Sequence, residues 1–182
     1  MDCISKGKAH KRYEFGTKVS VATTNRGGFV VGMRALPGNP YDGHTLAEAL
    51  EQVEILTDQK PEFAFVDRGY RGHGVENVKV FISGAKRGVT RTIAKLLRRR
   101  SAIEPMIGHM KNDGRLTRST LKGTKGDALF AVLCGCGHNI RMILRHLRTV
   151  LRMLFSLIHQ ICMIVDQEIA FGRRDQVNKL TA

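Results

Sequence analysis

The sequence predicts an α/β fold in which a mixed sheet carries helices packed against it. Strand signals come first: residues 13–24 alternate between apolar and polar side chains, and an apolar stretch over 29–36 follows after a turn. Two short apolar runs, 63–67 and 78–82, then lie among segments of helical periodicity. The 182 residues are 42% hydrophobic, which is enough for a folded core.

An antiparallel hairpin is predicted at the start of this fold. Residues 13–24 read as a half-buried strand, because apolar side chains recur at every second position. The residues expected to share its buried face are Tyr13, Phe15, Thr17, Val19 and Val21. The sequence NRGG at 25–28 predicts a turn, and residues 29–36 predict the partner strand.

The first helix is predicted to begin at Thr45, after a loop rich in proline, glycine and asparagine at 37–43. Thr45 and Glu48 have the spacing of a capping box, in which the two side chains bond reciprocally to the backbone of the first turn. The residues expected to face inward are Leu46, Ala49, Leu50, Val53 and Leu56.

The apolar runs at 63–67 and 78–82 predict short strands covered on both faces. The first run ends on Asp67, beside the glycine-rich loop RGYRGHG. Open α/β sheets bind ligands at the carboxyl ends of their strands, so Asp67 is a candidate functional acid. The alternative is that Asp67 caps the turn before Gly69, a role that aspartate fills well.

A second candidate acid lies in a helical segment expected from about 89 to 113, with a disturbance at Pro105. On one continuous helix Arg100, Glu104, Lys111 and Arg115 would share a face, as one acid framed by three cations. The alternative is a solvated, salt-bridged face. If Ser101 caps a later helix, proline falls in its first turn and Arg100 lies just outside.

Together Asp67 and Glu104 could hold Mg²⁺, or Mn²⁺ in its place, because hard cations prefer oxygen ligands and complete their shells with water and phosphate. Such ions serve phosphodiester chemistry by activating a water or a hydroxyl and by stabilising the departing oxygen. The cations beside Glu104 would then hold a DNA backbone.

The overall charge points to a polyanionic partner. Lysine and arginine total 30 against 16 acids, a formal net charge of +14, and the excess is concentrated in residues 83–125. Residues 41–67 are acidic instead. Nucleic acid is therefore the favoured partner, with a solvated basic surface or a ribosome-like protein as the alternative.

Four scattered cysteines and an N-terminus without an apolar signal segment predict a cytoplasmic protein. Helical spacing from about 125 to 165 predicts a long C-terminal helix. Its apolar stretch 150–165 contains Arg152 and His159, so a buried helix is expected rather than a membrane span. The tail at 166–182 shows no readable pattern.

Several further groups are weaker candidates. Asp42 and His44 could face a metal site, although shaping the loop and the helix start is the favoured reading. Cys134, Cys136 and His138 lack a fourth zinc ligand, so small residues for close packing are expected there. Tyr70 and Arg71 could touch a base or a phosphate.

Four arginines at helical spacing form a stripe in the C-terminal segment. The stripe could follow a phosphate backbone or form an exposed amphipathic face, the two interpretations being about even. Its members are Arg141, Arg145, Arg148 and Arg152.

At this point long blocks of the sequence resemble a known family. The chain resembles the C-terminal part of a bacterial insertion-sequence transposase of the DDE type, in the group conventionally numbered five. The resemblance covers most of residues 3–150. It rests on CISKGKAHKRYEFGTKVSVATT, GNPYDGHTLAEALEQ, FVDRGYRG, RRRSAIEPMIGHMKNDGRL and LKGTKGDALFAVLCGCGHNIRMIL, which occur in this order.

The resemblance implies a ribonuclease-H-like fold in which three acids bind two Mg²⁺ ions. It implies cleavage at transposon ends and joining of the freed 3′-hydroxyl to target DNA. Asp67 corresponds to the second acid and Glu104 to the third. The family's arginine and lysine positions are filled by Arg100 and Lys111, whereas Leu97 stands at its tyrosine position.

The family's first acid and its first strand lie upstream of the block CISKGKA, and Asp2 has no strand context to replace that acid. The resemblance therefore predicts a sheet lacking its first strand, as in a truncated, split or decayed transposase. The expected division is a partial catalytic core at 1–125, a helical segment packing on it at 126–165, and a tail at 166–182.

The leading hypothesis is a truncated DDE transposase that binds transposon ends and target DNA through Arg100, Lys111, Arg115 and Arg71. It would form a homo-oligomer or join full-length transposase, near the nucleoid and away from membranes. One rival is a catalytically dead DNA-binding remnant that inhibits or assists full-length transposase. The other is a basic RNA-binding structural protein.

Overall fold

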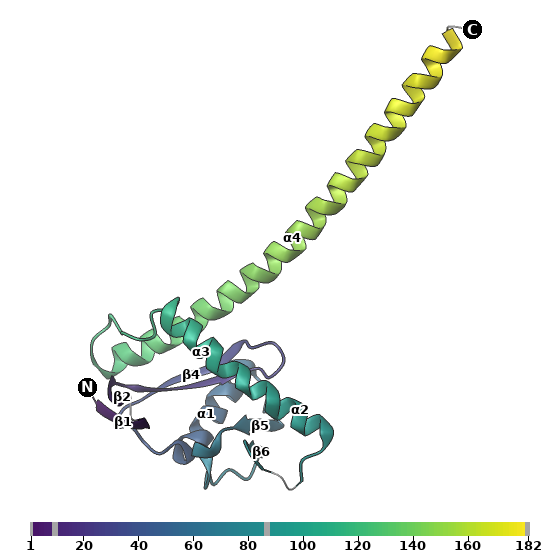
Figure 1. The fold of residues 1–182 in the computed structure, drawn as a ribbon. Helices are drawn as coiled ribbons and strands as arrows, with labels where there is room; N and C mark the ends of the chain where they lie inside the picture. The colour runs from purple at the N-terminus through teal and green to yellow at the C-terminus, as the bar shows by residue number, and fades with distance from the viewer. Residues whose placement is uncertain (1, 9–10, 86–87, 181–182) are drawn as a thin grey trace. The chain divides into compact units, whose positions relative to one another are not determined.

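The computed structural model describes residues 2–8, 11–85 and 88–180. Two compact units emerge, Met1–Asn139 and Ile140–Ala182 (Figure 1). The first unit contains all the strands and the helices α1 to α3. The helix α4, Gly123–Leu180, begins in the first unit and makes up the second.

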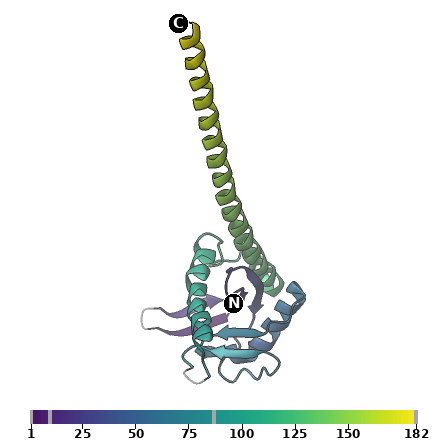
Figure 2. The ribbon, with the colours of Figure 1, turned by 90° about the vertical axis from the view of Figure 1, so that its right-hand side faces the viewer.

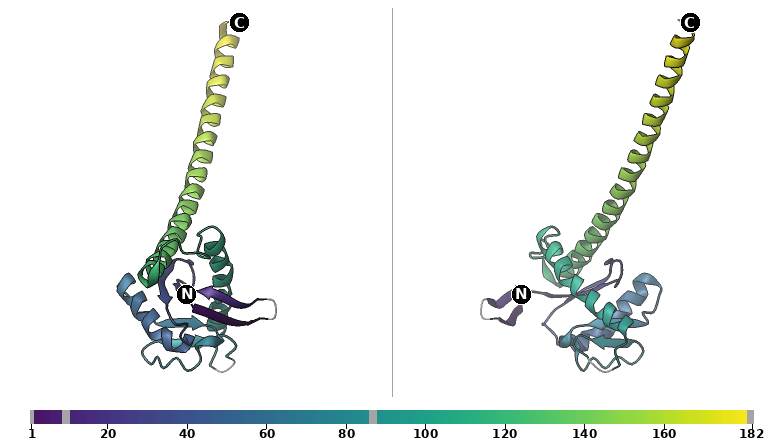
Figure 3. Two further views of the ribbon diagram at one scale, coloured as in Figure 1. Left: turned by 90° about the vertical axis from the view of Figure 1, so that its left-hand side faces the viewer. Right: turned by 45° about the vertical axis from the view of Figure 1, so that its right-hand side comes forward.

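The first two strands form a hairpin of their own. β1 (Asp2–Lys8) pairs antiparallel with β2 (Lys11–Gly16), and Figures 2 and 3 show this hairpin projecting from the other strands. Of the residues predicted to share a buried face, Tyr13 and Phe15 are 59% and 71% exposed. The prediction was wrong for this half because the chain breaks at Gly16, whose φ of +146° is one that other residues rarely adopt.

The second hairpin agrees with the sequence pattern. β3 (Lys18–Thr23) pairs antiparallel with β4 (Val30–Leu36), and the turn between them is closed where the Thr24 amide donates to the Phe29 carbonyl at 2.8 Å. Val19 and Val21 pack against the core as predicted. The half-buried strand expected from the alternation is therefore confirmed here.

The helix α1 spans Asp42–Thr57, three residues longer at its start than predicted. Thr45 lies inside the helix, where its hydroxyl donates to the Asp42 carbonyl at 2.8 Å, so the predicted capping box was wrong. Leu46 and Ala49 are buried as expected. Leu56 is 64% exposed, because the inward stripe ends before the last turn.

The two apolar runs form β5 (Phe63–Val66) and β6 (Lys79–Ile82), which pair in parallel. They are less covered than predicted, with Phe63 39% exposed. Within the described ranges the strands form three two-stranded sheets, so the expectation of one mixed sheet was wrong. β3 and β5 do not pair with each other, and that missing pairing is what separates the sheets. The mixed α/β composition itself is confirmed.

The basic helical segment is divided at its proline. α2 (Arg91–Arg99) leads through a 3₁₀ turn, η2 (Arg100–Ala102), into α3 (Ile103–Asn112). Pro105 lies in the first turn of α3, where its missing N–H costs little. Ser101 is not the cap residue; Ala102 holds that position without a side-chain bond.

The core of the first unit lies between the β3–β4 hairpin, α3 and the start of α4. Its buried members are Met33, Met110, Ala131 and Cys134. The side chain of Asn139 ties α4 to β4, because it both accepts from the Val30 amide and donates to the Val30 carbonyl, each at 2.8 Å. Gly135 allows this close approach, since a Cβ there would lie 3.0 Å from Met33 Sδ.

The C-terminal helix differs from its prediction in length and burial. It continues to Leu180, through most of the tail that showed no pattern. The side chains at 150–164 are exposed, including Phe155 at 69%, so the predicted buried helix was wrong. Among the helices described, the segment Gly123–Ile164 is long and apolar enough to cross a membrane by length and composition, a weak indication that soluble helices also give.

Candidate active site

Asp67 stands directly after β5, where the chain enters the 3₁₀ turn η1 (Arg68–Tyr70). Its Oδ1 accepts a hydrogen bond from the Gly69 amide at 3.0 Å. The capping interpretation made from the sequence is therefore confirmed. This bond occupies one carboxylate oxygen and fixes the direction of the other.

The second oxygen of Asp67 faces Arg100. Arg100 Nη2 lies 3.4 Å from Asp67 Oδ2 and 3.9 Å from Glu104 Oε1. Because Asp67 Oδ2 and Glu104 Oε1 contact the same nitrogen, the separation of the two oxygens cannot exceed the sum of these two distances. Two acids that are distant in the sequence thus meet around one guanidinium group.

Three local structures produce this meeting. Asp67 directly follows β5, η2 contains Arg100, and the first turn of α3 contains Glu104. Arg100 is outside α3, as the reading with proline in the first turn required. The Arg100 side chain is only 18% exposed, whereas those of Asp67 and Glu104 are 46% and 72% exposed. The acids are therefore open to solvent while the cation between them is largely covered.

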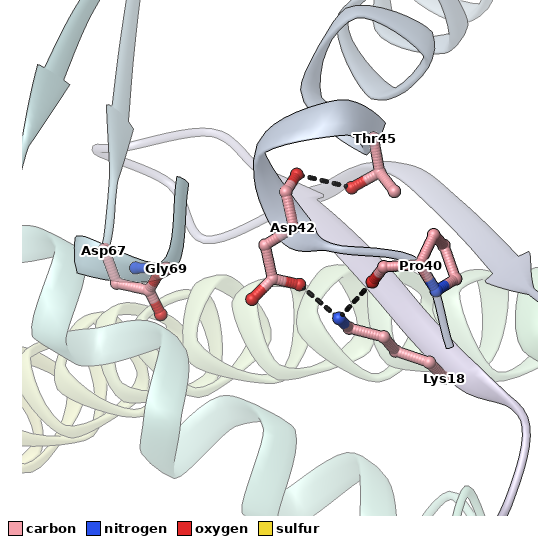
Figure 4. A network of polar contacts seen from close by, with 6 residues as sticks. All are labelled: Lys18, Pro40, Asp42, Thr45, Asp67 and Gly69. Atoms are coloured by element: carbon pink, nitrogen blue, oxygen red, sulfur yellow. Dashed lines mark hydrogen bonds and ion pairs between the residues drawn. The ribbon is translucent and has the colours of Figure 1, made fainter. Parts of the chain in front are cut away.

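A third acid lies close to Asp67. A Cβ on Gly69 would lie 2.7 Å from Asp42 Oδ2 and 3.1 Å from Asp67 Oδ1, so glycine is needed where the two carboxylates flank the backbone. Asp42 Oδ1 pairs with Lys18 Nζ at 2.5 Å, and Lys18 also donates to the Pro40 carbonyl (Figure 4). Asp42 thus shapes the start of α1, as the favoured reading held, and also borders the site.

Tyr70 was only a weak candidate in the sequence. Burial raises the pKa of its phenol above the ordinary value of 10.0, and the nearby carboxylates Asp42 and Asp67 raise it further. A hydrogen bond with the Ser20 side chain and the charge of Arg100 oppose that rise. Tyr70 therefore stays protonated at neutral pH, as an O–H group beside the acids. Its position after Asp67 was visible in the sequence, but its burial was not.

The remaining predicted site residues are placed as follows. Lys111 lies in the last turn of α3, two turns after Glu104 and on the same side of the helix. Arg115 lies beyond the end of that helix with a φ of +57°, so the predicted shared helical face was wrong for Arg115.

Two further candidates lie beside Tyr41. Arg71 is exposed, and its carbonyl accepts from the Tyr41 hydroxyl at 2.9 Å. His44 is exposed and packs edge-on against the Tyr41 ring.

The cysteine-rich turn of α4 serves packing, as expected. Cys134 is buried in the core and donates to the Gly114 carbonyl at 3.1 Å, and a His138 ring nitrogen lies 3.2 Å from the Gly28 carbonyl. The arginine stripe is exposed along α4, at Arg141, Arg145, Arg148 and Arg152.

The donor set suits a hard cation with few protein ligands. Asp67 Oδ2 and Glu104 Oε1 converge and are exposed, which leaves room for the waters that Mg²⁺ keeps. Over the described ranges, the His, Cys, Asp and Glu side chains form no group of three or more able to hold a metal ion. Arg100 stands between the two acids, in the position that a bound cation would contest.

One comparison with known proteins finds a similarity over part of the chain. Residues 4–79 match the model of the transposase DDE domain, a similarity that suggests a function in transposition. This family generally uses divalent metal ions, and its partner is DNA. The match includes Asp67 and ends at the first residue of β6, before Glu104. Searches of curated proteins and of solved structures find no significant match.

Proposed function

We propose that this chain acts as a DDE-type transposase of group five, in which Asp67 and Glu104 hold a divalent cation. The observation that carries the proposal is the convergence of both acids on Arg100 Nη2. Two carboxylates presented by different elements at an exposed rim make a site that can take Mg²⁺ or Mn²⁺ together with substrate phosphate. A cation bound there would activate a water or 3′-hydroxyl and stabilise the departing oxygen.

The protein's own residues have separable roles in this proposal. The Gly69 amide fixes one Asp67 oxygen, so that the other faces Arg100. Arg100 holds the two carboxylates together before substrate arrives and can turn to a DNA phosphate afterwards. Lys111, Arg115 and Arg71 contact the DNA backbone on either side, for transposon ends and target alike. The core at 1–125, the helical segment at 126–165 and the tail at 166–182 remain the proposed division.

A rival deserves testing because Arg100 occupies the space between the acids. A protein that keeps this ion pair and never exchanges it for metal would be a DNA-binding remnant, able to inhibit or assist full-length transposase. Metal binding distinguishes the transposase from the remnant, because only the transposase is expected to bind a metal ion, whereas both are expected to bind DNA.

Titration of the full chain with Mn²⁺, followed by the loss of its free electron-paramagnetic-resonance signal, measures metal binding. We expect weak binding that Asp67→Asn and Glu104→Gln each abolish. Glu48→Gln is the matched control, because Glu48 is also half-exposed and paired with an arginine, Arg34, at 3.0 Å. Equal binding by all variants, or none by the wild type even with an upstream transposase fragment added, would reject the metal site and favour the remnant.

Arg100→Ala sharpens this test. Removing the guanidinium leaves two carboxylates without their cation, so Mn²⁺ binding should strengthen while DNA binding weakens. Arg98→Ala is the control, because Arg98 is exposed and its side chain donates only within its own helix, to the Ala94 carbonyl. If both arginine variants behave alike, Arg100 has no special place in the site.

Self-association through α4 is also part of the proposal. Apolar residues recur along it at alternating spacings of four and three, the pattern of a coiled-coil seam. Each is between 46% and 56% exposed: Ile140, Leu144, Leu147, Leu151, Leu154, Ile158 and Ile161. A seam three heptads long suits a second copy of the same helix, in keeping with the homo-oligomer expected from the sequence.

A further inference from the structure

The C-terminal helix has an arginine stripe that the proposed active site does not use. Its members follow one another in α4 at spacings of four, three and four residues, and all are exposed: Arg141, Arg145, Arg148 and Arg152. At 3.6 residues per turn their directions fall within about 60° of one another, so they share one face of the helix. Ser156 and His159 extend this face with two more exposed polar side chains.

Along the helix this stripe is far from any carboxylate. The sequence has no aspartate or glutamate between Asp127, which is 14 residues before Arg141, and Asp166, which is 14 residues after Arg152. Fourteen residues of helix extend about 21 Å, which exceeds the distance of about 8–10 Å over which salt screens charges. Arginines three or four residues apart therefore repel one another with no acid to offset the repulsion, and a bound polyanion would relieve it.

The arginine stripe lies outside the apolar seam proposed for self-association. The seam runs from Ile140 to Ile161 and is centred roughly 120° around the helix from the arginines. Two helices joined along the seam would therefore keep both arginine stripes exposed. Stripe and seam occupy the same turns of α4, so the arginines would lie on the outside of a paired rod.

Two kinds of polyanion have the charge to bind the stripe, DNA and an anionic membrane. A basic amphipathic helix binds a membrane by burying its apolar face among the lipids. In the proposed assembly a second copy covers the apolar seam, so that face is not available to lipid. The transposase DDE domain, which residues 4–79 match, has DNA as its partner. DNA is therefore the occupant that the observations favour.

A pair of helices can reach the DNA backbone but cannot enter a groove. One α-helix with its side chains is about 10–12 Å in diameter, and the major groove is about 12 Å wide, so the groove admits one helix but not two side by side. The seam spans the whole stripe, so the paired helices do not separate at the arginines. The guanidinium groups would therefore contact phosphates, which carry no sequence information.

We propose that the arginine stripe of α4 is a second DNA-binding surface, which binds the phosphate backbone of duplex DNA without preference for sequence. It is separate from Arg100 and Lys111, which belong to the first unit of the chain. The restriction to backbone contacts rests on the proposed self-association, and the choice of DNA rests on the proposed function in transposition. The metal site plays no part in it.

Fluorescence anisotropy with two labelled DNA duplexes of unrelated sequence tests the proposal on the full chain, in EDTA so that no metal contributes. The test variant replaces all four arginines of the stripe by glutamine, which propagates a helix about as well as arginine. Each lost phosphate contact lowers the slope of log K against log salt concentration by about 0.9. We expect the slope to fall by about 3 for both duplexes, with at least about tenfold weaker binding at about 0.1 M salt.

A second variant keeps the composition and moves the charge. It combines Arg145→His with His146→Arg, and Arg152→Met with Met153→Arg. The net charge stays at +14, and two of the arginines are turned about 100° around the helix. Two phosphate contacts are lost, so the slope should fall by about 2. A wild-type slope in this variant would mean that any positive charge suffices, and it would overturn the stripe as a site.

Sedimentation of the glutamine variant distinguishes this proposal from the proposed self-association. Its seam is intact, so the variant should sediment as the wild type does. A wild type that is monomeric at every concentration would reject the seam and with it the backbone-only contact, whereas an unchanged slope in the glutamine variant would reject the stripe alone. A preference for one duplex that is lost with the arginines would overturn backbone-only binding. Lost binding to vesicles of anionic phospholipid, with DNA binding unchanged, would assign the stripe to a membrane instead.

Discussion

Met110 in α3 is fully buried, whereas Met153 in the distal part of α4 is 61% exposed. Both lie in helices whose apolar residues recur at helical spacing, yet the first helix contributes to the core and the second leaves its stripe uncovered. The spacing of apolar residues therefore specifies a helix and the direction of its apolar face, but not what covers that face. The same lesson applies to the strands, since Val30 of β4 also bonds to the Asn139 side chain of α4, whereas β3 pairs with β4 alone among the described residues.

The largest expected effect is on the stability of the protein, from a substitution at the buried Met110. Met110→Ala should lower the free energy of unfolding by about 2–5 kcal/mol, because it leaves a cavity in the core. Met153→Ala should change it by less than about 0.5 kcal/mol, because the side chain is exposed. Urea denaturation measures both. Similar losses for the two variants would show that the distal helix is covered in solution.

The next largest effect is expected on self-association, and it tests whether a second copy of the chain covers the distal part of α4. Leu147→Glu combined with Leu154→Glu puts charges on the proposed seam, so the protein should sediment as a smaller species than the wild type. His146→Glu combined with Thr149→Glu adds two glutamates off the seam and should leave the assembly unchanged. Analytical ultracentrifugation at several concentrations decides this. A wild-type monomer throughout would remove self-association from the proposal.

A smaller effect on stability is expected at Gly69, which two carboxylates approach. Gly69→Ala places a methyl group 2.7 Å from Asp42 Oδ2, so it should destabilise the protein by about 1–3 kcal/mol and weaken Mn²⁺ binding. Gly108→Ala in α3 meets open space and should stabilise by about 0.5–1 kcal/mol. Thermal melts of both variants measure the difference. A Gly69→Ala protein as stable as the wild type would mean that the acids are not held close.

The smallest expected effect is on stability at alkaline pH, where Tyr70 ionises. The pKa of Tyr70 is raised in the folded protein, so its contribution to stability is complete below the unfolded pKa of 10.0 and is lost as pH rises through the folded pKa. Tyr70→Phe cannot ionise, so its stability relative to the wild type should increase above pH 10. Urea midpoints at pH 8 and above pH 10 test this. A constant difference between the two proteins would mean that Tyr70 is exposed in solution.

Much of the candidate site was accessible from the sequence, because its parts are local. A carboxylate that ends an apolar run predicts the rim of a sheet, and this identified Asp67. The alternative in which a later helix holds Pro105 in its first turn placed Arg100 outside that helix and Glu104 inside it, and the structure agrees on both residues. Arg115 was misplaced because the end of α3 cannot be read from charge spacing, and Asp42 was undervalued because its nearness to Gly69 depends on α1 packing beside η1.

The sequence by itself determined most of the strands and helices, from the β3–β4 hairpin to the start of α4, because the alternation of apolar residues and the positions of glycine and proline act within a few residues. It did not determine β1 or the helical continuation of α4 over the tail. It also determined the positive charge and the two acids. Only the tertiary structure decided that both acids lie against one arginine and that β3 and β5 belong to separate sheets. Those arrangements depend on packing between residues far apart in the chain, which no local pattern encodes.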